Sequence, residues 1–386
     1  MFANIGMRYL KRRQLFLFAL FFGLCGPGLT RAQSWRWTIE DLDDKNPQQT
    51  SIVADKDGNV HLAYYLPEGF GELRYAFRSA GDSRWFKMTL DEHLGVFSTG
   101  IGLDSNDNPS ICYTPREMKY IHWNGQKWSS QQVDPNSGLI AYHCSIQFAQ
   151  HDVPHITWYL ESVFVLRHAA LEDGTWKVRS VEVGMESGKW NSLVLDKNNL
   201  PHVAYSSFAK DELKYAHFDG RDWARTVIDT SEGNPQPGAR GMGASLVLDP
   251  EGNPRISYYD VNSLKYARFI AGKWKIEVIE QLPPFVVWSW KNFQSTQLLD
   301  RDGNPHISYE SYLGLKHAWW DGKQWHTQLI RPYIDGFFFE SCMTMDSQGN
   351  LYISLKDPFD GTLKVAIGTR TQPLDAAKAG SKNSSN

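Results

Sequence analysis

Hydrophobic and polar residues alternate along most of the chain, in short runs separated by turn residues. The stretches "HLAYY" at 61–65 and "HISYE" at 306–310 follow a period of two, which is typical of strands with one buried face. Clusters of Gly, Asn, Asp and Pro, such as "KDGN" at 56–59, separate these runs. Beyond the first 32 residues we find no convincing helical period. The pattern therefore predicts an all-β protein built from antiparallel strands.

The predicted strands fall into a repeat. Residues 304–325, "NPHISYESYLGLKHAWWDGKQW", closely echo residues 253–274, "NPRISYYDVNSLKYARFIAGKW". Related stretches recur in units of about 50 residues, each with four strand-like runs. The first run of each unit ends at Asp55, Asp104, Ala149, Asp196, Asp249, Asp300 or Asp346. Seven four-stranded units of this length are typical of the blades of a β-propeller.

The same pattern predicts how the ring of blades closes. The fourth run of a unit opens on a tryptophan, and these residues are Trp37, Trp85, Trp128, Trp176, Trp223, Trp274 and Trp325. The seventh unit ends at 363–370 without one, whereas "WTIEDLD" at 37–43 matches "WKIEVIE" at 274–280. We therefore predict a seven-bladed β-propeller over residues 33–370. Its N-terminal strand completes the last blade, so that no sheet edge stays open.

The repeat resembles the BNR or Asp-box-like propellers of the sialidase superfamily, from Trp35 to about Arg370. The Asp-box itself is approximated by "ALEDGTW" ending at Trp176 and "WDGKQW" ending at Trp325. The resemblance implies the propeller fold. The three arginines with which sialidases hold a carboxylate cannot be assigned to positions here. Some propeller polysaccharide lyases share a related repeat, but no blade of this chain shows their histidine pair.

Both ends of the chain depart from the repeat. Basic residues at 11–13 precede an apolar run at 15–24, and Ala32 ends a small-x-small cleavage site, so we expect residues 1–32 to be a signal peptide. The apolar run is too short to span a bilayer. We therefore expect a secreted or periplasmic protein, cleaved after Ala32, with no membrane partner. Residues 371–386 are polar, and we expect a disordered tail there.

Composition narrows the partners. A net charge of -3 with mixed signs does not favour nucleic acid as a partner. Three cysteines would remain after cleavage, Cys112, Cys144 and Cys342. An odd number spread along the chain does not indicate a disulfide framework, and each lies in an apolar run, so we expect buried thiols. We expect a monomer with no cofactor and no metal.

Residues that recur from blade to blade are expected to hold the ring together rather than to bind one ligand. Histidines recur in separate blades, where they cannot converge on one metal ion, and we expect them to be packed and hydrogen-bonded; they are His61, His155, His202 and His306. Third strands share a basic residue, namely Arg74, Lys119, Arg167, Lys214, Lys265, Lys316 and Lys364. We interpret this position as a solvated or inter-blade pairing site; the alternative is a cationic collar for an anionic polymer.

Two rings of residues on the first strands define the central channel. Small residues recur at Ser51, Gly100, Ser145, Ser192, Ser245, Thr296 and Cys342, as crowding of seven strands near the axis requires. Two residues earlier, nearer the mouth, stand Gln49, Ser98, His143, Trp190, Gly243, Gln294 and Glu340. Here the symmetry breaks. Because one ligand needs only a few blades, the mouth is the predicted site.

Long connections to the same face support this prediction. "QLPPFVVWSWKN" at 281–292 and "RPYIDGFFFES" at 331–341 are rich in aromatic residues. Aromatic rings stack on the C–H faces of sugars, and polar groups bind sugar hydroxyls, so we expect a carbohydrate ligand. The predicted ligand-binding residues are Gln49, Lys189, Trp190, Arg240, Trp288, Trp290, Lys291, Gln294, Asp335 and Phe339, with Phe337 beside them.

Catalysis would require titratable groups at this mouth. His143 and Glu340 are predicted to face each other across it, as the acid and base of a glycoside hydrolase. His143 with Tyr142 would instead suit proton abstraction beside a uronate, as in a polysaccharide lyase. Three functions stay open: a glycan-binding module, a glycan-cleaving enzyme and a non-catalytic protein-interaction scaffold.

Overall fold

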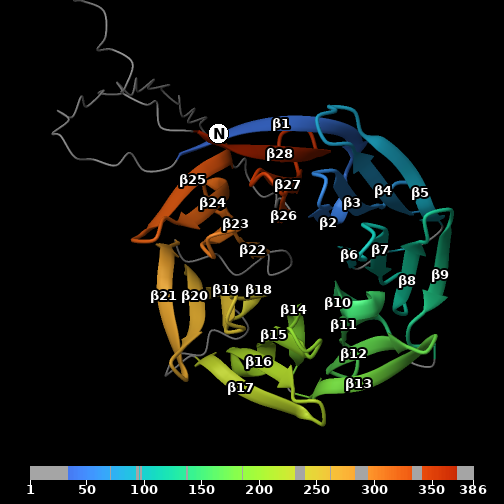
Figure 1. The fold of residues 1–386 in the computed structure, drawn as a ribbon, viewed down its shortest axis with the longest axis vertical. Coiled ribbons are helices and arrows are strands. Elements are labelled where there is room, and N and C mark those ends of the chain that lie inside the picture. Colours follow the sequence, from blue (N-terminus) through green and yellow to red (C-terminus); the bar gives the residue numbers. More distant parts are fainter. Residues whose placement is uncertain are drawn as a thin grey trace, which may run out of the picture. The chain divides into compact units, whose positions relative to one another are not determined.

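A computed structural model describes residues 34–371, except 70, 93–94, 96–97, 136–137, 185, 231–239, 261, 283–293 and 333–340. The described strands form seven four-stranded antiparallel sheets, and Figure 1 shows them arranged as blades around a central axis. This confirms the all-β, seven-bladed propeller. The expected signal peptide at 1–32 lies outside the described residues. So does the expected tail, apart from Thr371, which ends the last strand.

The first three blades run in chain order from the axis to the rim (Figure 1). Blade 1 comprises β2 (Gln48–Ala54), β3 (Val60–Leu66), β4 (Glu72–Arg78) and β5 (Phe86–Glu92). Blade 2 comprises β6 (Thr99–Leu103), β7 (Pro109–Tyr113), β8 (Lys119–Trp123) and β9 (Trp128–Gln132). Blade 3 comprises β10 (Ala141–Phe148), the short 3₁₀ helix η1 (Gln150–Asp152), β11 (Pro154–Leu160), β12 (Val165–Glu172) and β13 (Thr175–Val183).

The next three blades repeat this plan. Blade 4 comprises β14 (Ser187–Leu195), β15 (Pro201–Ser207), the 3₁₀ helix η2 (Phe208–Lys210), β16 (Glu212–Phe218) and β17 (Trp223–Thr230). Blade 5 comprises β18 (Met242–Leu248), β19 (Pro254–Asp260), β20 (Ser263–Ile270) and β21 (Lys273–Gln281). Blade 6 comprises β22 (Ser295–Leu299), β23 (Pro305–Ser311), β24 (Gly314–Trp320) and β25 (Trp325–Pro332).

Blade 7 closes the ring with strands from both ends of the described chain. It comprises β26 (Cys342–Met345), β27 (Leu351–Lys356), β28 (Thr362–Thr371) and, at its rim, β1 (Ser34–Lys45). β1 pairs antiparallel with β28 from Ser34 opposite Thr371 to Lys45 opposite Thr362. Trp37 lies opposite Gly368, where any Cβ would stand 2.8 Å from the indole ring. The closure predicted from the displaced tryptophan is thus present, and a glycine makes room for it.

The hydrophobic core lies between neighbouring blades. Four of the tryptophans that open the fourth strands pack edge-on against a tyrosine in the third strand of the preceding blade, and Trp37 and Trp223 meet a histidine there instead. Trp128 meets Tyr75 with ring centroids 5.2 Å apart, and Trp325 meets Tyr266 at 5.1 Å. Edge-to-face pairs of this kind add stability beyond the area they bury. This contact explains why tryptophan recurs with the period of the blades.

Four of the seven recurring basic residues, all lysines, tie neighbouring blades together, as the pairing interpretation predicted, whereas Arg74 and Lys364 pair with acids of their own blades. Lys119 Nζ lies 3.1 Å from Asp91 Oδ2 in the preceding blade, and Tyr113 donates a hydrogen bond to the same carboxylate. Lys214 repeats the arrangement with Glu182, and Lys316 does so with Glu280. Because these lysines already pair with acids, they do not form a free cationic collar.

The recurring histidines and acids stabilise turns. Asp55 accepts hydrogen bonds from the backbone N–H groups of Asp57 and Asn59, and Asp300 does the same for its own turn. His61 lies 2.7 Å from the Tyr75 hydroxyl, and burial lowers its pKa. These residues are therefore architectural, as their repetition predicted.

Candidate functional site

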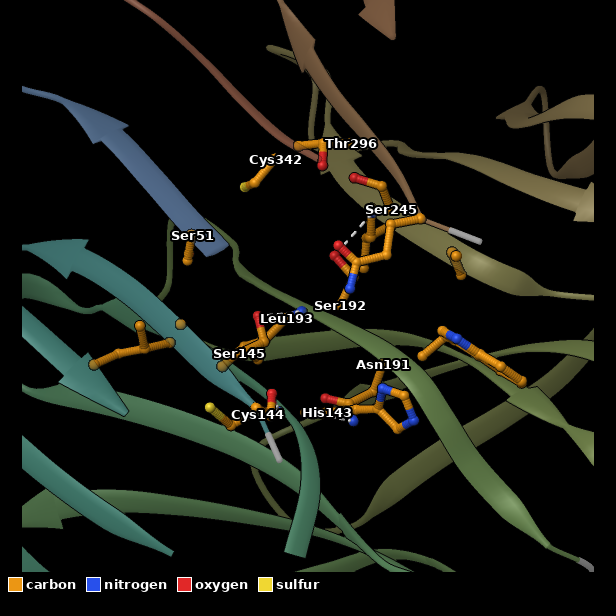
Figure 2. A pocket seen from close by; sticks show the side chains of 18 of the residues that line it. Ser51, His143, Cys144, Ser145, Asn191, Ser192, Leu193, Ser245, Thr296 and Cys342 are labelled. Atoms are coloured by element: carbon orange, nitrogen blue, oxygen red, sulfur yellow. Dashed lines mark hydrogen bonds between the residues drawn. The ribbon is translucent and has the colours of Figure 1, made fainter. Parts of the chain in front are cut away.

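The first strand of each blade lines the central channel (Figure 2). We call its small residues the inner belt: Ser51, Gly100, Ser145, Ser192, Ser245, Thr296 and Cys342. The sequence predicted small size here, but the structure shows a second requirement. Four belt serines accept a hydrogen bond from a backbone N–H of the next blade, and the donors for Ser51, Ser145, Ser192 and Ser245 are Ile101, Leu193, Leu246 and Gln297 at 3.0 to 3.2 Å. The belt is therefore a set of latches between blades.

Two residues before the belt lies the mouth ring, described for Gln49, Ser98, His143, Trp190, Gly243 and Gln294. Four of these residues have left-handed backbones, with φ of 54° at Gln49, 52° at His143, 48° at Trp190 and 56° at Gly243. In each case the pairing with the second strand shifts register at this point. A bulge re-aims the side chain of the residue it carries. Non-glycine residues rarely adopt this backbone, and such positions cluster at functional sites.

The belt and the mouth ring together enclose a cavity of about 340 Å³. Amides, hydroxyls and one imidazole line it, from Gln49, Ser98, His143, Asn191 and Gln294. Among the described residues that line this cavity, none is Asp, Glu, Lys or Arg. The described part of the cavity therefore suits an uncharged ligand with many hydrogen-bonding groups.

His143 lies in the channel wall beside Asn191 (Figure 2). Its ring centroid is 5.5 Å from that of Trp190 and 6.4 Å from that of Tyr142. Burial, with a smaller contribution from the charge of Lys189, lowers the pKa of His143 to about 4. The imidazole is therefore neutral at pH 7, where one ring nitrogen donates and the other accepts.

Asn191 holds this histidine in place, and the sequence interpretation missed it. Its Nδ2 donates to the His143 carbonyl at 2.6 Å and to the Gly188 carbonyl at 3.1 Å, while Thr157 donates to its Oδ1 at 2.7 Å. At two other junctions between blades, a hydroxyl group binds the equivalent carbonyl of the bulged residue. Thr99 donates to the Gln49 carbonyl, and Ser295 donates to the Gly243 carbonyl. Asn191 takes the place of these hydroxyl residues in blade 4. The alignment of the blades already showed this difference in residue type.

Three more predicted residues lie close to His143. Tyr142 is half-buried, and burial followed by the charge of Glu161 raises its pKa, so it stays protonated. Lys189 Nζ lies 3.4 Å from Glu161 and 4.6 Å from the centroid of Phe208. Trp190 lines the cavity but is only 9% exposed, because it packs into the core of the neighbouring blades. It therefore offers a ring edge rather than an open platform.

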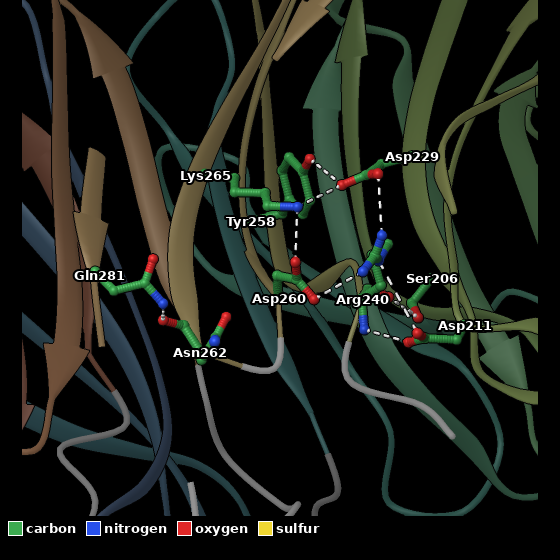
Figure 3. Close-up of polar contacts among 9 residues, drawn as sticks. All are labelled: Ser206, Asp211, Asp229, Arg240, Tyr258, Asp260, Asn262, Lys265 and Gln281. Atoms are coloured by element: carbon green, nitrogen blue, oxygen red, sulfur yellow. Dashed lines mark hydrogen bonds and ion pairs between the residues drawn. The ribbon is translucent and has the colours of Figure 1, made fainter. Parts of the chain in front are cut away.

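Arg240, also predicted to bind ligand, lies in an ion-pair network between blades 4 and 5 (Figure 3). Its guanidinium is 3.0 Å from Asp229 and 3.1 Å from Asp260, and its backbone N–H donates to Asp211 at 2.8 Å. Lys265 pairs with the carboxylates of both Asp229 and Asp260. The positive charge of Arg240 is thus already compensated by acidic side chains. We therefore interpret Arg240 as a structural residue that joins the two blades.

The remaining predicted residues lie outside the described part of the chain: Trp288, Trp290, Lys291, Asp335, Phe337, Phe339 and Glu340. The facing of His143 and Glu340 across the mouth therefore stays a prediction. Within the described ranges, no group of three His, Cys, Asp or Glu side chains is arranged to hold a metal ion. The described part of the chain contains no helix that is long and apolar enough to cross a membrane.

No protein-family model matches the chain, and no curated protein matches it in sequence. Solved structures do match. A lectin from Burkholderia pseudomallei has a TM-score of 0.61 at 14% identity, over 86% of this chain and 99% of its own. Virginiamycin B lyase from Staphylococcus aureus has a TM-score of 0.59 at 11% identity, over 87% and 99%. A polysaccharide lyase has a TM-score of 0.55 at 10% identity, over 84% and 90%. At these identities the likeness shows a shared fold.

Proposed function

We propose that this protein binds a saccharide at the mouth of its central channel. The observation that carries the proposal is the mouth ring itself. Four of its six described residues sit at bulged positions, and the six vary in chemistry around the ring, whereas the belt two residues further on is uniformly small. A surface that departs from the symmetry of its scaffold is where a single asymmetric ligand binds.

The chemistry of the cavity specifies the ligand further. At about 340 Å³ it lies at the small end of ligand pockets, which suits one or two sugar units. Neutral amides, hydroxyls and the His143 imidazole both donate and accept, as sugar hydroxyls do. With no acidic or basic side chain among the described lining residues, the part of the site that we describe favours a neutral sugar over a uronate or sulfate.

Two further observations support a carbohydrate ligand. The structural neighbours with this fold include a lectin and a polysaccharide lyase. The repeat also resembles the propellers related to sialidases, and the predicted export signal at 1–32 would place the site outside the cytoplasm.

The test is a glycan array followed by calorimetry on His143→Ala. We expect binding to at least one neutral glycan and a loss of about tenfold or more in the variant, because a buried hydrogen-bond partner is removed from the ligand. The melting temperature should stay close to that of the wild type. The matched control is His122→Ala in β8, which removes a histidine remote from the mouth and should leave the affinity unchanged. Equal affinity of His143→Ala and wild type would refute this site.

The pKa of His143 adds a pH signature to the same experiment. With a pKa of about 4, the imidazole keeps one protonation state from pH 8 down to about 5.5. Affinity should therefore be flat over that interval and fall as the pH approaches 4. A step near pH 6.5 would contradict the buried placement of His143, because 6.5 is the ordinary histidine pKa.

A second candidate is cleavage of the bound glycan. The neutral His143 can accept a proton, and Tyr142, whose pKa is raised, can donate one, which is the pair of roles that β-elimination needs. This reaction requires a uronate in the bound glycan, in contrast to the neutral sugar that the described cavity favours. Hydrolysis would instead require Glu340 opposite His143. Incubation of the retained glycan with the protein separates these outcomes: unsaturated ends indicate a lyase, new reducing ends indicate a hydrolase, and intact glycan indicates a binding module. Failure to retain any glycan would favour the scaffold alternative.

A further inference from the structure

Two of the three cysteines expected in the mature protein meet at the junction between blades 2 and 3. Cys112 lies on β7 and Cys144 on β10, and their Sγ atoms are 2.7 Å apart. Both are buried, with 0% and 8% of their surface exposed. Two unbonded sulfur atoms in ordinary contact lie farther apart than this. Both are free cysteines in the structure, as the sequence predicted, but the fold brings their sulfur atoms together, which the sequence did not predict.

The inner belt changes at the same junction. Ser51, Ser145, Ser192 and Ser245 each latch their blade to the next one, but blade 2 has Gly100, which has no hydroxyl to offer. Cys112 lies directly opposite Gly100 in the sheet. A Cβ on Gly100 would stand 2.9 Å from Cys112 Sγ and 3.1 Å from the Cys144 carbonyl oxygen. The glycine therefore leaves its space to the sulfur pair.

We propose that Cys112 and Cys144 form a disulfide that takes the place of the missing serine latch. The bond forms by exchange with a disulfide-bonded oxidant, such as oxidised glutathione or a thiol oxidase of the exporting compartment. One cysteine thiolate attacks the donor and releases its first thiol, and the second cysteine then displaces the donor's other sulfur. Two protein thiols lose two electrons and two protons, and the donor disulfide is reduced to two thiols.

Blade 2 benefits most from such a bond. Each of its strands is 5 residues long, whereas those of blade 3 have 7 to 9. Cys144 directly follows His143 in the chain, and its backbone N–H donates to Ser98 Oγ at 2.8 Å. The disulfide would therefore fix the wall of the mouth next to His143.

Burial sets the timing of the bond. Burial, with a further contribution from Cys144, raises the pKa of Cys112, so its thiol is unreactive in the folded protein. Exchange must then occur before blades 2 and 3 pack together. A test must accordingly refold the chain in the presence of the oxidant.

The experiment starts from chain 33–386, the expected mature form, unfolded and reduced. It is refolded in a mixture of reduced and oxidised glutathione, unfolded again without reductant, alkylated and digested for mass spectrometry. We expect a peptide pair joined through Cys112 and Cys144, with Cys342 alkylated. Alkylation of all three cysteines, or a pair that includes Cys342, would overturn the proposal.

Two variants and one thermal measurement complete the design. Cys342→Ser should leave the joined peptide unchanged, and Cys112→Ser should expose Cys144 to alkylation. Wild-type protein refolded without oxidant should melt about 5 °C lower than the oxidised form, because the bond closes a loop of about 30 residues. An equal melting temperature would mean that the bond does not serve as a latch. These readouts need no glycan, so they are independent of the proposed saccharide site.

Discussion

The inner belt and the six described residues of the mouth ring lie two residues apart along the chain, yet they follow opposite rules. Belt residues are small, and four of them bind the backbone of the next blade. Four of the described mouth residues sit on bulges, and the six together include amides, a hydroxyl, an imidazole, an indole and a glycine. Belt positions are crowded by the neighbouring blade and stay small, whereas the described mouth positions carry side chains of different size and chemistry. The comparison separates residues that hold the ring of blades together from residues that are available to bind a ligand.

The largest expected effect comes from breaking the belt at Gly100. Gly100→Ser should lower the free energy of unfolding by about 2–3 kcal/mol, because the new Cβ would overlap Cys112 and a backbone carbonyl. In protein refolded without oxidant, where no Cys112–Cys144 bond contributes, adding Cys112→Ala should recover most of this loss, since Ala63 and Ala204 already stand opposite Ser51 and Ser192. Urea titration measures both variants. A double variant no more stable than the single one would show that crowding by the sulfur is not the cause.

A smaller effect is expected from a single latch. Ser192→Ala should lower the free energy of unfolding by about 1–2 kcal/mol, because the Leu246 N–H loses its buried acceptor. Ser192 also lines the cavity, but its Oγ already accepts the Leu246 N–H, so glycan affinity should fall far less than in His143→Ala. Denaturant titration and calorimetry on the same preparation check the pair. If Ser192→Ala weakened binding as much as His143→Ala, the division between belt and mouth would fail.

The smallest effect concerns the backbone of the mouth. Gln49 has a left-handed φ of 54°, and Gly243 occupies the equivalent place in blade 5. Gln49→Gly should therefore be more stable than Gln49→Ala by about 1 kcal/mol, because only glycine adopts this backbone without strain. Thermal unfolding of the two variants measures the difference. Equal stabilities would mean that the bulge is not strained.

Most of the fold was predictable, because the same pattern of four strands recurs in seven units of the sequence. The displaced Trp37 indicated the closing strand. The lysines, histidines and terminal acids recur from blade to blade, and this recurrence predicted that they have structural roles. What recurs in every blade reports packing between blades, so the alignment alone separates it from the site. The same alignment placed both the belt and the mouth ring in the channel.

The site was less predictable, because its contacts join blades that the alignment treats separately. Trp190 was expected as an open platform, but the core of the next blades covers it. Arg240 was expected at the ligand, but the acids that bind it come from three different connections and strands. The pairing of Cys112 with Cys144 needs the register of β7 against β6 and the packing of blade 2 on blade 3. None of these follows from a residue's place within its own repeat.

The closing strand has a consequence for how the protein is made. β1 is the first described strand to be synthesised, and β28, its only partner in the described sheet, is the last. Six blades can assemble in order as they emerge, but the seventh needs β1 as well as β28, which is made more than 300 residues later. A chain that ends prematurely before β28 leaves the hydrogen bonds of β1 unmade and the circle broken. Synthesis of β28 is therefore a condition of reaching the native state.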